Sequence, residues 1–136
     1  MRIGGYDIPI RFNSKAMIDI ETLINGDVDK LSEYIGAEGI TTATTVKRVA
    51  EILTILANGE IFAYNQDIDA GFIQAEKKKF LTVDFFLAHL DINDMGECIK
   101  SINDEMYKGT SVVIPDGVQI AEEDEVLAEI EEIKNQ

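Results

Sequence analysis

The hydrophobic positions of residues 44–58 recur with the period of an α-helix. Spacings of i, i+3, i+4 and i+7 place six apolar residues on one face of such a helix: Val46, Val49, Ala50, Leu53, Leu56 and Ala57. Ile52 and Ile55 widen this apolar face. At about 100° per residue, the apolar arc covers more than half of the circumference. A helix of this kind must be covered on several sides. We therefore expect 44–58 to be the central helix of the fold, ended by Gly59 in a left-handed conformation.

The first twelve residues have the two-residue period of β-strands. Gly4-Gly5 suits a two-residue turn between Met1–Ile3 and Tyr6–Phe12, and apolar residues then alternate with polar ones up to Phe12. Pro9 has no N–H to donate and places the second strand at an edge. The pattern predicts a short N-terminal β-hairpin.

Two helices are predicted between the hairpin and the central helix. The first is capped by Asn13 or Ser14 and ends at Gly26, and the second runs from Asp27 to Gly36. We expect the residues that face inward on these helices to be Ala16, Met17, Ile20, Leu23, Ile24, Val28, Leu31 and Ile35. A Thr-rich linker follows, in which Thr44 or Thr45 can cap the central helix.

Beyond the central helix the pattern is less regular. Residues 60–79 are compatible with one helix interrupted at Gly71 or with two short helices. Thr82 opens a further helix, and Asn93 or Asp94 caps another that closes at Gly109. We expect these two helices to bury Val83, Phe86, Leu87, Leu90, Met95, Cys98, Ile99, Ile102 and Met106.

The period changes again after residue 110. Ser111–Ile120 contains the turn Pro115-Asp116-Gly117 and is compatible with a second short hairpin. An acidic, weakly amphipathic helix is predicted from Glu122. The fold class is thus mainly α: a compact domain of five to six helices around 44–58, with a short N-terminal hairpin. Residues 1–110 form the helical domain, and 111–136 form a β-turn segment with an acidic tail.

Composition limits the class of protein. A length of 136 residues suits one domain, and an apolar content of 46% argues against disorder of the whole chain. No apolar run approaches the length of a membrane span, the N-terminus lacks the apolar region of a signal peptide, and one Cys gives no disulfide framework. We expect a cytoplasmic protein that does not enter membranes.

The formal net charge is −14, of which residues 122–134 carry −6. This balance disfavours nucleic acid and anionic membranes as partners, because phosphate binding depends on Lys and Arg. One interpretation is an acidic surface that meets a basic partner or imitates nucleic acid. The simpler interpretation, which we favour, is a charge that keeps the protein soluble through self-repulsion.

Candidate metal ligands do not form a complete set. Asp91, Asn93 and Gly96 match positions 1, 3 and 6 of a calcium loop, but Met95 and Ile102 occupy positions that need oxygen ligands. The isolated pair Asp67 and Asp69 is a weak signal that a solvated turn explains. We therefore expect no metal site.

Catalytic candidates are equally sparse. His89 is the only histidine and lies at the polar edge of its helix, whereas Cys98 lies in an apolar stripe as a small buried hydrophobe. Lys77–Lys79 is the only basic cluster, and we interpret it as cations at a helix C-terminus. Phosphate-binding glycine loops, G-x-S-x-G and Cys-x-x-Cys are absent from the sequence. We expect a non-enzyme without catalytic residues or cofactor.

Three features in this order resemble the small tail assembly chaperones of long-tailed bacteriophages and prophages. The opening Tyr6–Asn13 runs directly into a helix; Val46–Gly59 is a helix that ends in a small residue and glycine; and Phe80–Val83 opens a helix that is followed by a last helix, Asp94–Gly109. The resemblance covers residues 6–109. It implies a non-enzymatic protein of the host cytoplasm that binds the long, apolar, helical tape measure protein and helps to recruit tail tube subunits.

The resemblance also suggests where such a partner binds. The candidate partner-binding residues are the apolar and aromatic residues Ile61, Phe62, Tyr64, Phe72, Phe85 and Phe86, each of which is also compatible with an ordinary core role. Self-association is compatible with the sequence. Many members also have a longer form made by frameshifting, and Ile133-Lys134-Asn135 is compatible with a slippery codon run. The alternatives are an acidic nucleic-acid mimic, which inhibits a DNA-binding enzyme, and a minor structural tail component.

Overall fold

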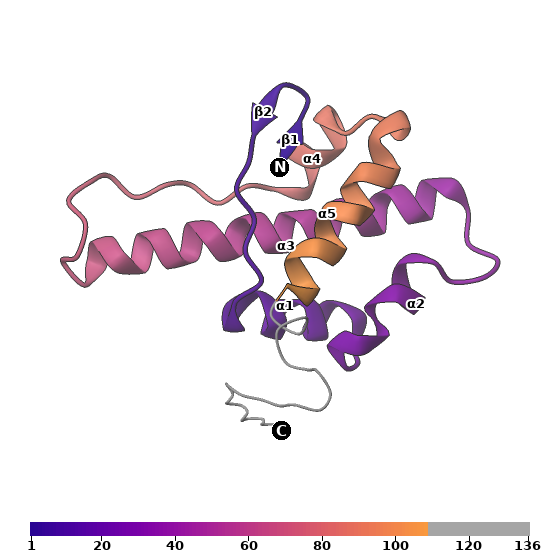
Figure 1. Cartoon of the computed structure of the whole chain (residues 1–136), viewed down its shortest axis with the longest axis horizontal. Helices are drawn as coiled ribbons and strands as arrows, with labels where there is room; N and C mark the ends of the chain where they lie inside the picture. The colour runs from indigo at the N-terminus through magenta and orange to yellow at the C-terminus, as the bar shows by residue number, and fades with distance from the viewer. Residues whose placement is uncertain (109–136) are drawn as a thin grey trace. The chain divides into compact units, whose positions relative to one another are not determined.

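The computed structural model describes residues 1–108, which are mainly helical with a short antiparallel hairpin, as the sequence predicts (Figure 1). The elements are β1 (Arg2–Ile3), β2 (Tyr6–Asp7), α1 (Ser14–Ile24), the 3₁₀ turn η1 (Val28–Lys30), α2 (Leu31–Ile35), α3 (Thr42–Asp69), α4 (Val83–His89), the 3₁₀ turn η2 (Ile92–Asp94) and α5 (Met95–Tyr107).

The chain divides into two units, Met1–Ile102 and Asn103–Gln136. Of the second unit only 103–108 are described; they continue α5 and include an ion pair between Lys108 and Glu105. The predicted hairpin at 111–120, the acidic tail from Glu122, the helix end at Gly109 and the domain boundary at 110 lie outside the described residues.

The hairpin has the predicted two-residue turn. Arg2 is opposite Asp7 and Ile3 is opposite Tyr6, and the turn residues Gly4 and Gly5 have φ values of 56° and 87°. Positive φ at both central positions is the requirement of a type I′ turn, which explains the glycine pair. The second strand is shorter than predicted, because the chain leaves the hairpin after Ile8, which still bonds to Met1, and then crosses α3.

The two helices after the hairpin follow the prediction with small corrections. Asn13 caps α1, and its side chain accepts a hydrogen bond from the Ala16 N–H at 3.0 Å. The left-handed residue at the end of α1 is Asn25, with φ 54°, rather than Gly26. Met17 is exposed, whereas the buried positions of the predicted stripes include Ala16, Ile20, Leu31 and Ile35.

The central helix is much longer than predicted. Thr41 rather than Thr44 or Thr45 is its N-cap, and α3 continues through Gly59 to Asp69 over 28 residues. The prediction that Gly59 ends the helix is wrong, because this glycine serves a close approach. A Cβ there would lie 2.8 Å from the Arg11 carbonyl oxygen and 3.3 Å from the Ala16 Cβ. The Arg11 N–H donates to the Leu56 carbonyl at this crossing.

Residues 60–82 differ most from the sequence-based expectation. Residues 60–69 complete α3, so they do not form a separate helix. Gly71 has φ 85° and reverses the chain, and residues 70–82 return beside α3 without regular secondary structure. We call residues 70–82 the strap. Lys77–Lys79 lie in the strap, so their predicted place at the end of a helix is also wrong.

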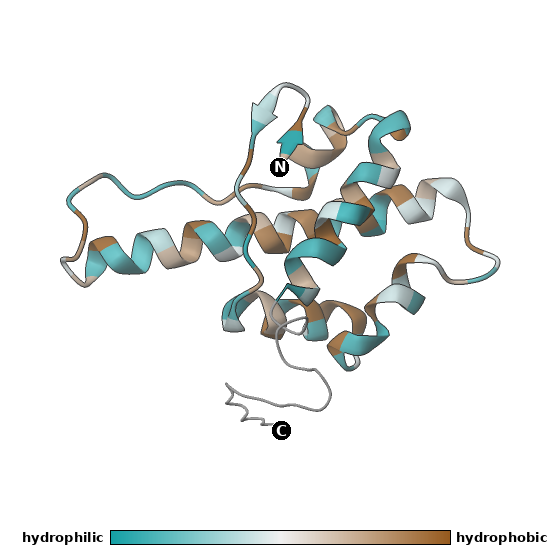
Figure 2. Ribbon diagram, viewed as in Figure 1, coloured by the Kyte–Doolittle hydropathy of each residue, from teal (hydrophilic) through white to brown (hydrophobic). Residues whose placement is uncertain are grey.

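The core of Met1–Ile102 is built around the N-terminal two-thirds of α3. This part of α3 packs against α1, α2 and α4, and Figure 2 shows it rich in hydrophobic residues, whereas its C-terminal end is more polar. The buried core residues of α3 are Val49, Ala50, Ile52, Leu53, Leu56 and Ala57. The prediction of a largely covered central helix is therefore confirmed.

The last helices confirm four of the nine predicted buried positions, and four others are half-buried. Thr82 caps α4, and Phe86, Cys98 and Ile102 are buried. Leu87 is exposed, contrary to prediction. Asp91 caps the 3₁₀ turn η2, which contains Asn93 and Asp94 and leads directly into α5. Among the described residues, the helices are too short or too polar to cross a membrane.

Candidate functional site

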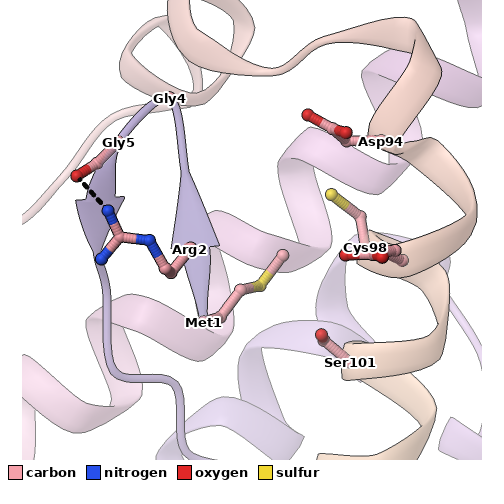
Figure 3. A pocket seen from close by; sticks show the side chains of 8 residues that line it. Met1, Arg2, Gly4, Gly5, Asp94, Cys98 and Ser101 are labelled. Carbon is pink, nitrogen blue, oxygen red and sulfur yellow. Dashed lines mark hydrogen bonds between the residues drawn. The ribbon is translucent and has the colours of Figure 1, made fainter.

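A cavity of about 520 Å³ lies between the hairpin and the start of α5 (Figure 3). Its lining consists of Met1, Arg2, Gly4, Gly5, Asp94, Glu97, Cys98 and Ser101. The Arg2 guanidinium folds back onto the turn and donates to the Gly5 carbonyl at 2.9 Å, and in Figure 3 it points away from Asp94. The Arg2 guanidinium is therefore not aimed at the carboxylates of the cavity, and the Met1 ammonium binds Asp7 and the Ile8 carbonyl.

The Cys98 thiol of this cavity is poorly suited to nucleophilic chemistry. Burial raises the pKa of the Cys98 thiol, and the negative charges of Asp94 and Glu97 raise it further. The reactive form is the thiolate, so a raised pKa suppresses reactivity at neutral pH. The description of Cys98 as a buried hydrophobe is thus confirmed.

The remaining candidates for metal or acid–base chemistry lie apart. His89 has its Nδ1 2.8 Å from the Phe85 carbonyl oxygen, and its ring packs edge-on against Tyr6 at 5.1 Å between centroids. It is half-buried, as predicted for a boundary residue. Asp69 forms an ion pair with Lys77 at 2.7 Å. Residues 1–108 contain no group of three or more His, Cys, Asp or Glu side chains placed to hold a metal ion.

The most distinctive surface is formed by the C-terminal part of α3, residues 60–69, together with the strap. We call these two segments the arm. Figure 1 shows the strap running back beside α3 from the tip of the helix towards α4. No regular ladder joins the two segments. Residues 70–73 bond to α3 carbonyls at the tip, and beyond the tip two asparagine side chains of α3 hold the strap.

Each asparagine binds the main chain of one strap residue at two points. The Asn65 side chain accepts from the Lys78 N–H at 2.9 Å and donates to the Lys78 carbonyl at 3.0 Å. Asn58 makes the same pair of hydrogen bonds with Leu81, at 2.8 and 3.0 Å. Asn65 is only 8% exposed, so these bonds satisfy a buried amide whose isolation would be unfavourable.

The strap places aromatic side chains in solvent. Phe72 is 82% exposed at the tip and Phe80 is 52% exposed near α4. Every residue from 74 to 80 is exposed. The strap therefore contributes little to the core, and its two phenylalanines remain available for contact with another molecule.

The predicted partner-binding residues separate into three places. Ile61, Phe62, Tyr64 and Phe72 all belong to the arm, where the first three are half-buried. The Phe62 ring lies under the Lys15 ammonium at 5.6 Å, and the Tyr64 ring lies under that of Lys78 at 4.4 Å.

The other two predicted residues are in α4. Phe85 is half-buried in an aromatic cluster with Tyr6 and His89, and Phe86 is fully buried in the core. Phe86 therefore has no surface to offer a partner. Sequence reasoning missed Phe80 as a contact candidate, since an extended segment has no period that separates exposed from buried residues.

Comparisons with known proteins identify no relative of this chain. No protein-family model matches the chain, and neither a curated protein nor a solved structure matches it.

Proposed function

We propose that this chain is a non-enzymatic polypeptide-binding protein, a phage tail assembly chaperone that binds the tape measure protein through the arm and helps to recruit tail tube subunits in the host cytoplasm. The observation that carries the proposal is the exposure of Phe72 and Phe80 on a strap with little core of its own. Large apolar groups held in solvent are typical of surfaces that meet a partner.

The chemistry of the arm supports a protein partner. Phe72 and Phe80 are bulky and flank a lysine cluster, and the half-buried Ile61, Phe62 and Tyr64 lie on the adjoining helix. Interfaces are enriched in aromatic residues, which contribute much of the binding energy. The net charge of −14 keeps copies of the chain apart while an apolar partner is covered.

Co-expression with a tape measure protein from the same tail gene cluster tests the proposal. We expect the wild-type chain to keep the tape measure protein soluble and to co-purify with it. A tape measure protein that stays insoluble, or that is soluble without binding, would contradict the proposal.

Matched variants assign the contact to the arm. Phe72→Ser and Phe80→Ser together should lower the yield of soluble complex by about tenfold, as expected for loss of two aromatic anchors. Ile92→Ser removes a side chain of comparable exposure, 64%, outside the arm and should leave the yield unchanged. Equal losses in both variants would show that general stickiness, rather than the arm, is responsible.

A further inference from the structure

The hydrogen bonds of Asn58 and Asn65 in α3 indicate the conformation in which a partner segment binds. We infer that Asn58 and Asn65 form a main-chain-binding track, which the strap fills in the free protein and which an extended, apolar segment of a partner polypeptide fills in its place. The inference rests on the proposed function for the existence of a polypeptide partner, and it adds the conformation of the bound segment.

The track binds backbone and not side chains. Each amide gives one acceptor to the N–H and one donor to the carbonyl of the same strap residue, Lys78 or Leu81. These bonds place no demand on the identity of that residue. A helical part of the partner cannot be bound in this way, because its N–H and carbonyl groups are already paired internally, so the track takes a non-helical part of that polypeptide. An extended segment is therefore the form that fits.

The spacing of the two asparagines matches an extended chain. Asn65 follows Asn58 by seven positions, which corresponds to about 10.5 Å along a helix. Their strap partners are three residues apart, which corresponds to about 9–10 Å of extended chain. The order is reversed, so the strap runs antiparallel to α3. The same face of α3 carries Ile61 between the asparagines and Ile68 beyond them, at spacings of three and four residues.

The strap is a poor apolar complement to this face. The strap residues that span the track are 78–81: Lys78, Lys79 and Phe80 are exposed, Leu81 is half-buried, and the Lys78 ammonium covers the Tyr64 ring. Ile61, Tyr64 and Ile68 remain half-buried. A segment with apolar side chains at these places makes the same four hydrogen bonds and buries more apolar surface. Such a segment can therefore displace the strap.

Lys78→Pro weakens the hold of the strap on the track without altering α3, because it removes one of the four hydrogen bonds. Proline removes the N–H that donates to Asn65 but accepts an extended conformation. Lys79→Pro is the matched control: it removes the same charge, and among residues 1–108 the Lys79 N–H has no hydrogen-bond acceptor. Both variants are made in the full chain, and circular dichroism verifies that they fold.

The probe is a fluorescent synthetic peptide with the sequence of residues 75–83, titrated by anisotropy at 0.15 M salt. We expect the dissociation constant to be about fivefold lower with Lys78→Pro than with Lys79→Pro, as loss of one competing hydrogen bond of the tethered strap implies. In the Lys78→Pro background, Asn65→Leu should abolish binding. A peptide that carries Lys78→Leu should bind more tightly than the unmodified peptide, because an apolar group then covers Tyr64.

Several results would overturn the inference. These are equal binding by the two proline variants, binding that survives Asn65→Leu, no binding by any variant, and no gain from the leucine-containing peptide. The assay contains no tail protein, so its failure is separate from a failure of the co-expression experiment. A positive peptide result with a negative co-expression result would retain the track and reject the tape measure protein as its partner.

Discussion

Gly59 is the residue at which the N-terminal segment and α3 approach most closely. In an open helix, Gly→Ala stabilises by about 1 kcal/mol because alanine has the higher helix propensity. Here the added methyl group meets the Arg11 carbonyl at 2.8 Å and the Asn13 Oδ1 at 3.0 Å. We predict that Gly59→Ala destabilises the protein by about 1–3 kcal/mol, the usual cost of overpacking.

Gly96→Ala is the control for this prediction, because Gly96 lies in α5 with no atom within 4 Å of an added Cβ. It should be neutral or stabilising by up to about 1 kcal/mol. Urea unfolding of both variants measures whether each substitution lowers or raises the free energy of unfolding. Stabilisation by Gly59→Ala would show that the N-terminal segment can move away from α3 without loss of stability.

Tyr34 links α2 to α3 and makes stability depend on alkaline pH. Its hydroxyl donates to the Glu51 Oε1 at 3.0 Å. Burial raises the pKa of Tyr34 above its ordinary value of 10.0; the hydrogen bond to Glu51 and the charge of Glu51 raise it further, and only Arg48 opposes them. The folded state thus holds the phenol proton more tightly than the unfolded state does, so its contribution is complete below pH 10 and is lost at higher pH.

We predict that Tyr34→Phe lowers the free energy of unfolding by about 1 kcal/mol at pH 7, as for loss of one hydrogen bond. The difference from wild type should shrink above pH 10. Urea titrations of both proteins at pH 7 and 10.5 measure it, and the other ionisable groups, which both proteins share, cancel in the comparison. A difference that stays constant or grows with pH would refute the assignment.

At the scale of elements, the strap is predicted to be the segment of Met1–Ile102 that opens most easily. Beyond the tip, where residues 70–73 bond to α3 carbonyls, it is held by four hydrogen bonds from two side chains and by the exposed Lys77–Asp69 ion pair, with little core contact. Regions with few buried apolar contacts open at low free energy. Trypsin can cleave after Lys77, Lys78 and Lys79 only when this segment leaves α3.

We predict that Asn65→Ala raises the rate of tryptic cleavage at Lys77–Lys79 by about fivefold or more, as loss of one to two hydrogen bonds implies. Asn93→Ala, in the 3₁₀ turn before α5, should leave that rate unchanged. Mass spectrometry of short digests identifies the cleaved bonds. Equal rates in the wild type and Asn65→Ala would mean that the asparagine does not hold the strap.

Local signals were sufficient for most elements but not for the arm. The Gly4-Gly5 turn and the caps at Asn13 and Thr82 were predictable, because each depends on residues close in sequence. The prediction for Gly59 is wrong because glycine is used both to end a helix and to allow another segment to approach closely, and the sequence does not distinguish these two uses. Only the fold brings Asn58 and Asn65 against the strap.

At the scale of the molecule, charge is the dominant feature. Half of the net charge of −14 comes from residues 1–108 and half from 109–136. Like charges destabilise a compact state, and salt screens them.

We predict that raising sodium chloride from 20 to 500 mM (~0.5 M, where screening acts within a few Å) increases the melting temperature by about 2–8 °C. Calorimetry of the wild type measures it, and a lower melting temperature at high salt would show that attractive ion pairs outweigh the repulsion.

Hydrogen exchange of the co-purified complex tests whether the arm contacts a polypeptide partner. We expect the amides of residues 60–69 in α3 to exchange more slowly in the complex than in the free chain, whereas those of α1 and the hairpin are unchanged. Slowed exchange confined to α1, or to the Tyr6–Phe85–His89 cluster, with no change in residues 60–69, would contradict it.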